Sequence, residues 1–209
     1  GRGRDANHRQ LPSRPRRSGL VVGYVGCRAG SQRCPNKNSK PFYGADSLID
    51  IKLRVLIRVP EIDYIIFSSD SSDYCSIAQK YADMNPGRVR VVRKDAKDAS
   101  SETTAAEYFQ YIADHLDSDV GAVVYAPVTA PMLEPTDFSN LIQAFLNSDP
   151  THFDSVGFVL ERRGHFWYAN QPLNYDPSDQ RGTQNALPIV EIPYTAHIVD
   201  RAAMSESRS

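Results

Sequence analysis

The sequence has few cysteines and no long hydrophobic run. Its three cysteines, Cys27, Cys34 and Cys75, are scattered, form no CxxC pair and have no histidine at the spacing of a metal site. This pattern argues against a disulfide scaffold or a zinc module, and it predicts free thiols in a reducing compartment, the cytoplasm. No apolar run approaches the roughly 20 residues that a membrane-spanning helix needs, so we expect no membrane association.

An excess of positive charge is also missing from most of the chain. The net charge is −1, but the first 18 residues carry six arginines against Asp5 alone. The remaining body is therefore acidic, which argues against a nucleic-acid partner. Residues 1–18 lack both an apolar signal-peptide core and the side chains of a packed domain, so we expect a disordered basic arm. A transit peptide and a polyanion-binding tail are the alternatives for this arm.

From residue 19 onward, short β-branched runs alternate with helical stripes. The expected strands are residues 19–25, 63–70, 88–92 and 120–126, and the expected helices are 47–59, 74–82, 105–116 and 135–147. Such alternation predicts a three-layer α/β/α fold with a mostly parallel, Rossmann-like sheet. After Pro150 the pattern becomes irregular, with short strands within 153–160 and 187–192. We expect residues 19–209 to form one domain with a small irregular β excursion.

The stretch "GCRAGSQRCPNKN", residues 26–38, directly follows the first expected strand. Ligands of parallel α/β sheets bind at the carboxyl ends of the strands. Glycine and serine allow backbone N–H groups to approach a ligand, and Arg28, Arg33 and Lys37 can neutralise several negative oxygens. The composition therefore favours a polyphosphate ligand, with a solvated basic turn as the alternative. Neither GxxxxGK[ST] nor GxGxxG is present, which argues against a P-loop and a dinucleotide fingerprint.

The order of residues in this stretch carries further information. "RAGSQRCPNKN" resembles the RxGSKxxPxKN motif of the acylneuraminate cytidylyltransferases, which activate sialic acid and related acidic sugars as CMP conjugates. Further segments follow the order of that family from about residue 19 to about residue 184: "FSSD", "DASSETT", "VTAPMLEPTDF", "FDSVGFV", His165, Trp167, "PLNYDP" and "RGTQ". The chain is similar to a divergent member of this family.

The resemblance implies a reaction and a set of roles. An oxygen of an acidic acceptor would attack the α-phosphorus of CTP, and pyrophosphate would leave. Arg28 would hold the triphosphate and Lys37 would stabilise the developing charge, so these two are the expected catalytic residues. The expected nucleotide-binding residues are Gly30, Ser31, Arg33, Asn38, Asp70, Thr103 and Thr104. Alternatively, Asp70 belongs to a helix N-cap region, and Thr103 and Thr104 belong to an ordinary first helical turn.

The sequence also departs from the family pattern. Pro127 replaces a glutamine that contacts the acidic sugar, Ala130 replaces a serine, and Leu133 replaces an arginine. Proline has no side-chain donor and leucine has no charge, which argues against sialic acid itself as the acceptor. A further sugar acid such as a nonulosonic acid, a phosphonate or another small acid would fit. The expected acceptor-binding residues are Thr129, Arg181 and Gln184.

The family also implies a metal and a dimer. In that family, the aspartates of a late "DID" motif hold Mg²⁺. No such motif occurs in this sequence up to Ser209. We therefore expect one of three explanations: the sequence is truncated, the metal is held by other residues, or the protein has lost catalysis. Asp70 is the best-placed remaining carboxylate for Mg²⁺. Family members dimerise through the region of residues 154–184, which predicts a homodimer. A degenerate member that binds nucleotide or a partner protein without turnover is the second hypothesis.

Overall fold

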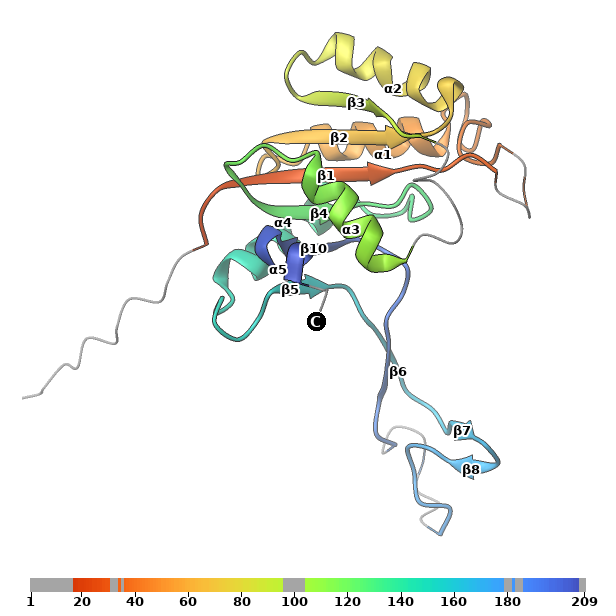
Figure 1. The fold of residues 1–209 in the computed structure, drawn as a ribbon. Coiled ribbons are helices and arrows are strands. Elements are labelled where there is room, and N and C mark those ends of the chain that lie inside the picture. The colour runs from red at the N-terminus through yellow and green to blue at the C-terminus, as the bar shows by residue number, and fades with distance from the viewer. Residues whose placement is uncertain are drawn as a thin grey trace, which may run out of the picture.

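A computed structural model describes residues 17–30, 34, 36–95, 104–178, 182 and 186–206. A six-stranded sheet in the order β3-β2-β1-β4-β10-β5 forms its centre (Figure 1). The sheet strands are β1 (Leu20–Gly26), β2 (Tyr64–Ser69), β3 (Val89–Arg93), β4 (Val120–Tyr125), β5 (Ser155–Gly157) and β10 (His197–Asp200). β1 to β4 are parallel, and β10 runs antiparallel to both β4 and β5. The predicted mostly parallel sheet is confirmed.

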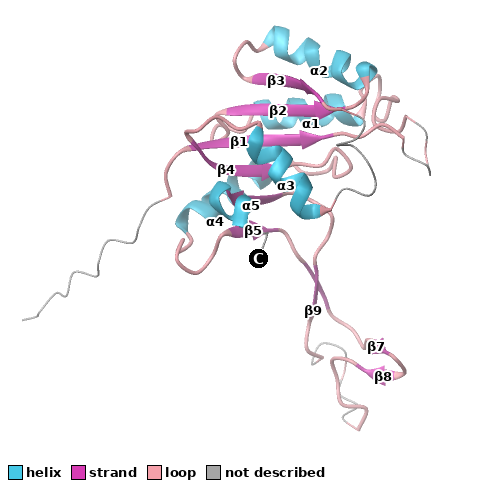
Figure 2. Ribbon diagram, viewed as in Figure 1, coloured by secondary structure: helices cyan, strands magenta, loops and turns pink. Residues whose placement is uncertain are grey.

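Helices cover both faces of this sheet (Figure 2). The helices are α1 (Leu48–Ile57), α2 (Ser72–Met84), α3 (Ala105–Asp114), α4 (Pro135–Asn147) and α5 (Arg201–Glu206). α1, α2 and α4 share one hydrophobic cluster on one face, and α3 and α5 share a second cluster on the other face. The predicted three-layer α/β/α architecture is therefore confirmed. No helix in the described ranges combines the length and apolar character needed to cross a bilayer.

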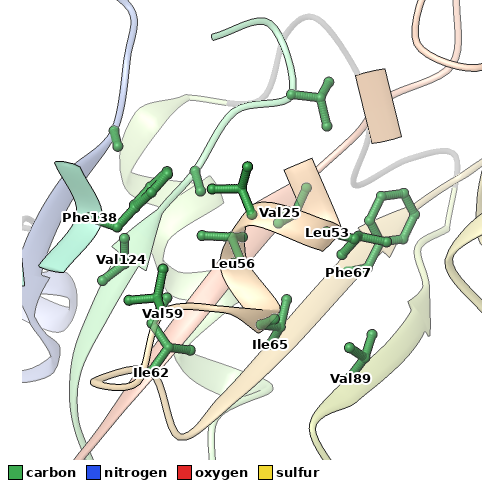
Figure 3. Close-up of a cluster of buried hydrophobic side chains, with 14 of the residues drawn as sticks. Val25, Leu53, Leu56, Val59, Ile62, Ile65, Phe67, Val89, Val124 and Phe138 are labelled. Carbon is green, nitrogen blue, oxygen red and sulfur yellow. The ribbon is translucent and has the colours of Figure 1, made fainter. Parts of the chain in front are cut away.

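The side chains of β1 point alternately to the two faces of the sheet and contribute to both hydrophobic clusters. Val21 and Val25 belong to the cluster with α1, α2 and α4, whereas Val22 and Tyr24 belong to the cluster with α3. Successive side chains of a strand point to opposite faces, so a continuous apolar run is what a central, doubly covered strand requires. Figure 3 shows the larger cluster, in which side chains from β1, α1, β2, β4 and α4 meet.

Local signals explain why several elements were predictable. α4 occupies residues 135–147 as expected, because Pro135 stands at its first turn and the Asp137 carboxylate accepts the Glu134 amide at 2.8 Å. α1 begins after Ser47, whose side chain and that of Asp50 form a capping box. The sequence did not predict β10 and α5, because β10 has only four residues and follows an irregular region.

The irregular excursion leaves the main sheet as an extended arm, which we define as residues 158–196 (Figure 1). It contains two small antiparallel pairs, β6 (Leu160–Arg162) with β9 (Ile189–Glu191) and β7 (Trp167–Tyr168) with β8 (Gln171–Pro172). Asn174 is buried there. Its Nδ2 donates to the carbonyls of Gly164 and Leu187, and its Oδ1 accepts the Phe166 amide. This single amide therefore connects three segments of the arm.

Two residues of the predicted basic arm, Arg17 and Ser18, fall within the described ranges. The Arg17 side chain is only 5% exposed and forms an ion pair with Asp200 at 2.8 Å. Its guanidinium also stacks on the Phe145 ring and donates to the Phe145 and Phe153 carbonyls. Arg17 thus packs against the end of α4 and the strand β10. The predicted disorder of residues 1–16 concerns residues outside the described ranges.

Candidate nucleotide site

The loop after β1, which we call the nucleotide loop (residues 27–38), begins at the carboxyl edge of the sheet beside the end of β2. The Cys27 amide donates to the Ser68 carbonyl at 2.9 Å, and the Ala29 amide donates to Oδ1 of Asp70 at 2.7 Å. Asp70 immediately follows β2 and is half-buried. Its carboxylate therefore fixes the first residues of the loop, a function that the sequence did not predict.

Backbone conformation shapes the rest of the described loop. Gly30 has φ = +81° with nothing near its missing Cβ, so its left-handed backbone rather than lack of space favours glycine. Asn36 is also left-handed, at φ = +55°, and its carbonyl accepts the amides of Ser39 and Lys40. This turn leaves Lys37 half-buried, while Arg28 at the start of the loop is exposed.

Asn38 is the buried polar residue of this loop. Only 6% of it is exposed, its Nδ2 donates to Sγ of Cys27 at 3.2 Å, and its carbonyl accepts the Ile49 amide at 3.3 Å. Burial raises the pKa of the Cys27 thiol to about 12, so this sulfur stays a neutral thiol. Oδ1 of Asn38 has no hydrogen-bond partner within the described ranges. A buried acceptor without a partner is costly, and a ligand N–H group would satisfy it.

Asp70 is also the predicted metal ligand. The ranges described contain no cluster of three or more His, Cys, Asp or Glu side chains arranged for a metal ion. Mg²⁺ is commonly bound through one or two carboxylates together with water and substrate phosphates. Oδ1 of Asp70 already accepts the Ala29 amide. Asp70 is therefore compatible with a metal held mainly by a nucleotide's phosphates, but not with a site built by protein ligands alone.

Thr104 caps the first turn of α3. Its Oγ1 accepts the Glu107 amide at 3.2 Å and donates to the Glu107 carboxylate at 2.8 Å. The Thr104 backbone amide also donates to the Glu107 carboxylate at 2.8 Å, and this bond, together with that from the hydroxyl, lowers the pKa of Glu107. The hydroxyl of Thr104 thus serves the helix in this structure, in agreement with the alternative of an ordinary first turn.

Thr129 lies exposed in the loop that follows β4, which we call the acceptor loop (residues 127–133). Pro127 is buried, and Leu133 packs against the core. In the family that this chain resembles, these two positions carry a glutamine and an arginine. Here both side chains are apolar and pack inside the protein. The predicted residues Ser31, Arg33, Thr103, Arg181 and Gln184 lie outside the described residues.

A tyrosine cluster borders the same edge of the sheet and was not predicted. The rings of Tyr24, Tyr108 and Tyr125 lie 6.1 to 6.4 Å apart, and the Tyr125 and Tyr194 hydroxyls are 2.7 Å apart. A Cβ on Gly26 would lie 2.0 Å from the Tyr108 hydroxyl, so this glycine provides space for α3. The periodic stripe over residues 105–116 predicted the helix that carries Tyr108, but nothing in the sequence pairs Tyr108 with Gly26.

These features define a nucleotidyltransferase-type α/β domain with a candidate nucleotide site at the carboxyl edge of its sheet. Residues 22–197 match a family model described as cytidylyltransferase. The chain therefore belongs to the cytidylyltransferase family, a family of nucleotidyltransferase enzymes, which confirms the resemblance at that level. A search of curated proteins found no significant match.

Solved structures agree in fold. A CMP:2-keto-3-deoxy-manno-octonic acid synthetase complexed with CTP superposes with a TM-score of 0.63 at 13% identity, over 90% of this chain and 77% of that chain. The 4-diphosphocytidyl-2C-methyl-D-erythritol synthase of Anaerococcus prevotii gives a TM-score of 0.61 at 18% identity, over 90% of this chain and 72% of that chain. At these identities the likeness supports the fold alone.

Proposed function

We propose that this protein transfers CMP from CTP to a small acidic acceptor and releases pyrophosphate. The observation that carries the proposal is the nucleotide loop. It begins at the carboxyl edge of the sheet, is anchored by Asp70 and contains the buried Oδ1 of Asn38, for which the described residues offer no hydrogen-bond partner. An acceptor atom of this kind suits an amino or N–H group of a base. Membership of the cytidylyltransferase family makes cytosine the base in question.

In the proposed reaction, an oxygen of the acceptor attacks the α-phosphorus of CTP in line, and the bond to the pyrophosphate oxygen breaks. Phosphoryl and nucleotidyl transfer depend mainly on positioning and on neutralisation of charge. The exposed Arg28 and the half-buried Lys37 are the cations proposed for this task, together with the backbone N–H groups around Gly30.

Mg²⁺ is the proposed cofactor, with Asp70 as its protein ligand. The metal would neutralise phosphate charge. Because Asp70 also anchors Ala29, the same carboxylate would connect the conformation of the loop with the charge of the bound nucleotide.

The proposed acceptor is a sugar acid or another small acid. Pro127 and Leu133 contribute neither a donor nor a charge, which supports an acceptor recognised differently from sialic acid. Thr129, exposed in the acceptor loop, is the described residue proposed to contact it. The solved synthetase that acts on 2-keto-3-deoxy-manno-octonic acid makes that sugar acid the first acceptor to test.

We also propose a homodimer, formed through the arm. Its exposed apolar side chains include Trp167, Tyr168, Leu173, Leu187 and Ile192. Apolar groups gathered on one projecting segment are typical of a covered interface. Sedimentation of the chain at micromolar concentration as a monomer would contradict the dimer.

We further propose that the protein works in a reducing compartment, the cytoplasm, which its three free cysteines support.

The deciding experiment is a thermal-shift titration with CTP, UTP, ATP and GTP, each with and without Mg²⁺, followed by a pyrophosphate-release assay. A ligand that binds the native state raises its melting temperature. We expect a CTP-selective shift that grows with Mg²⁺, and pyrophosphate release with 2-keto-3-deoxy-manno-octonic acid or another acid of a panel. A CTP shift without release across the panel would favour the degenerate member, and no shift with any nucleotide would refute the proposal.

A further inference from the structure

Helix α1 contacts both loops of the candidate site. The Ile49 amide in its first turn donates to the Asn38 carbonyl of the nucleotide loop at 3.3 Å. Nζ of Lys52, one turn later, donates to the Ala130 carbonyl of the acceptor loop at 2.8 Å. Residues three apart are neighbours on a helix surface. One turn of α1 thus connects the nucleotide loop to the acceptor loop.

Lys52 is an unusual residue for its position. It is only 1% exposed, and its ammonium lies 5.0 Å from the centre of the Phe138 ring in α4. No carboxylate within the described ranges forms an ion pair with it. Burial of a charge without a counter-ion is costly, and an unbranched apolar side chain of similar length would fill the same space. Packing alone therefore does not account for a lysine here.

The ammonium of Lys52 fixes the middle of the acceptor loop. Buried Val128 and half-buried Leu133 hold the two ends of this loop, whereas Thr129 and Met132 between them are exposed. The Ala130 amide closes a turn onto the Pro127 carbonyl at 3.3 Å within the loop itself. Within the part of the chain that the structure describes, the bond from Lys52 alone ties the middle of this loop to another element.

We propose that Lys52 is a positioning residue that holds the acceptor loop in the conformation that receives the acceptor, and that couples this loop through α1 to the nucleotide loop. The proposal rests on the proposed function, which assigns one loop to the nucleotide and the other to the acceptor. Its physical basis is a charge-assisted hydrogen bond from a buried ammonium to a backbone carbonyl. Because Lys52 acts on the backbone of Ala130, its effect does not depend on the side chains that contact the acceptor.

The test is hydrogen exchange of the full chain, comparing wild type with Lys52→Met. Methionine fills the space but cannot donate to Ala130. We expect the Ala130 amide, which donates to the Pro127 carbonyl, to exchange about tenfold faster, as loss of the bond from Lys52 implies. Amides of β1 and β4 should be unchanged, and the melting temperature should stay the same or rise. Lys80→Met, which removes an exposed lysine from neighbouring α2, is the matched control and should leave the acceptor loop unchanged.

Coupling between the loops is tested with CTP as the only ligand. CTP with Mg²⁺ should slow exchange of the acceptor loop in wild type, and this slowing should be largely lost in Lys52→Met. Unchanged acceptor-loop exchange in Lys52→Met would overturn the proposal. If that variant does not fold, the same measurement on Lys52→Leu, which also lacks a donor, decides the matter. A protein that binds no CTP but shows faster loop exchange in Lys52→Met would contradict the proposed function and leave the loop anchor standing.

With an acceptor that is turned over, the kinetic constants separate positioning from chemistry. For 2-keto-3-deoxy-manno-octonic acid as the probe, we expect Lys52→Met to raise the acceptor KM about tenfold, equivalent to 1.4 kcal/mol. The Kd for CTP alone should change less than twofold. An equal loss of CTP affinity would assign Lys52 to the general stability of the site rather than to the acceptor loop.

Discussion

The side chains of Asn38 and Lys52 are buried, polar and close to the two loops that a nucleotide and an acceptor would occupy. Each has an incomplete set of partners within the described ranges. Asn38 retains an unused acceptor oxygen, and Lys52 retains a charge without a counter-ion. Such residues weaken a fold unless a ligand or a loop makes use of them. Their presence at one site is therefore better explained by binding than by stability.

Arg28 and Lys37 are expected to matter for turnover rather than for folding. Arg28 is exposed and Lys37 is half-buried, so their removal leaves no cavity in the core. Arg28→Ala or Lys37→Ala should lower kcat/KM about 100-fold or more, because each cation would stabilise charge on the transferring phosphates. Steady-state pyrophosphate release measures this effect. Lys40→Ala, which removes an exposed lysine from the same turn as Lys37, serves as the control. Rates near wild type in both Arg28→Ala and Lys37→Ala would remove the loop from the proposed mechanism.

Asp70→Asn separates the two proposed tasks of this carboxylate. Asparagine retains an oxygen that can accept the Ala29 amide, but it has no charge to offer a metal. We therefore expect a stable fold and a several-fold higher Mg²⁺ concentration for half-maximal activity. As a control, Asp73→Asn changes an exposed acid in the first turn of α2 and should leave the dependence of activity on Mg²⁺ unchanged. An unaltered Mg²⁺ dependence in Asp70→Asn would remove Asp70 from the metal site.

At the scale of elements, the sequence predicted most of the sheet and its helices because local and global signals agree there. The strands β1, β2 and β4 are continuous apolar runs, and α4 has a proline at its start and an acid three residues after its cap. The position of the nucleotide loop followed from this alternation, because loops after parallel strands share one edge.

Long-range contacts were not predictable in the same way. The apolar stripe within residues 47–59 predicted a helix there, but it gave no indication that Lys52 is buried. The bond from Lys52 to Ala130 spans 78 positions. A periodic pattern contains no information on such a pair. The same holds for Asp70 with Ala29 and for Gly26 with Tyr108.

The contact between β1 and α3 gives an element-scale prediction. Gly26→Ala places a Cβ 2.0 Å from the Tyr108 hydroxyl before any adjustment, so the Tyr108 side chain must shift. We expect a loss of about 1–3 kcal/mol in the free energy of unfolding, as for other overpacked sites. The double variant Gly26→Ala with Tyr108→Phe removes the hydroxyl and should recover part of this loss in urea denaturation. Additive losses in the double variant would show that the hydroxyl is not the obstacle.

For the whole molecule, Lys52 predicts how stability depends on pH. Burial lowers the pKa of Lys52 from 10.5 to about 8, while the unfolded chain keeps the ordinary value. Below pH 8 the lysine is charged in both states, and the cost of burying it is fully present. Between pH 8 and 10.5 the unfolded state binds more protons at this lysine, so the contribution of Lys52 to the free energy of unfolding rises with pH, by about 3 kcal/mol at most.

Lys52→Met isolates this contribution, because all other groups titrate alike in both proteins. Urea denaturation at pH 7 and pH 9.5 should show the variant more stable than wild type at pH 7, with the difference smaller at pH 9.5. Parallel pH profiles of the two proteins would mean that Lys52 keeps its ordinary pKa in the folded state.

The pairing of β5 with β10 has a consequence for how this protein can diversify. Gly157 and His197 are cross-strand partners, so residues 158–196 leave and re-enter the sheet at neighbouring points. A segment inserted between such clamped ends can be lengthened, shortened or exchanged at a small cost in closure entropy. The half of the chain built from β1 to β4, which holds the candidate nucleotide site, does not have to change with it. The arm is therefore an exchangeable module, through which related chains could acquire new assemblies while they keep one nucleotide chemistry.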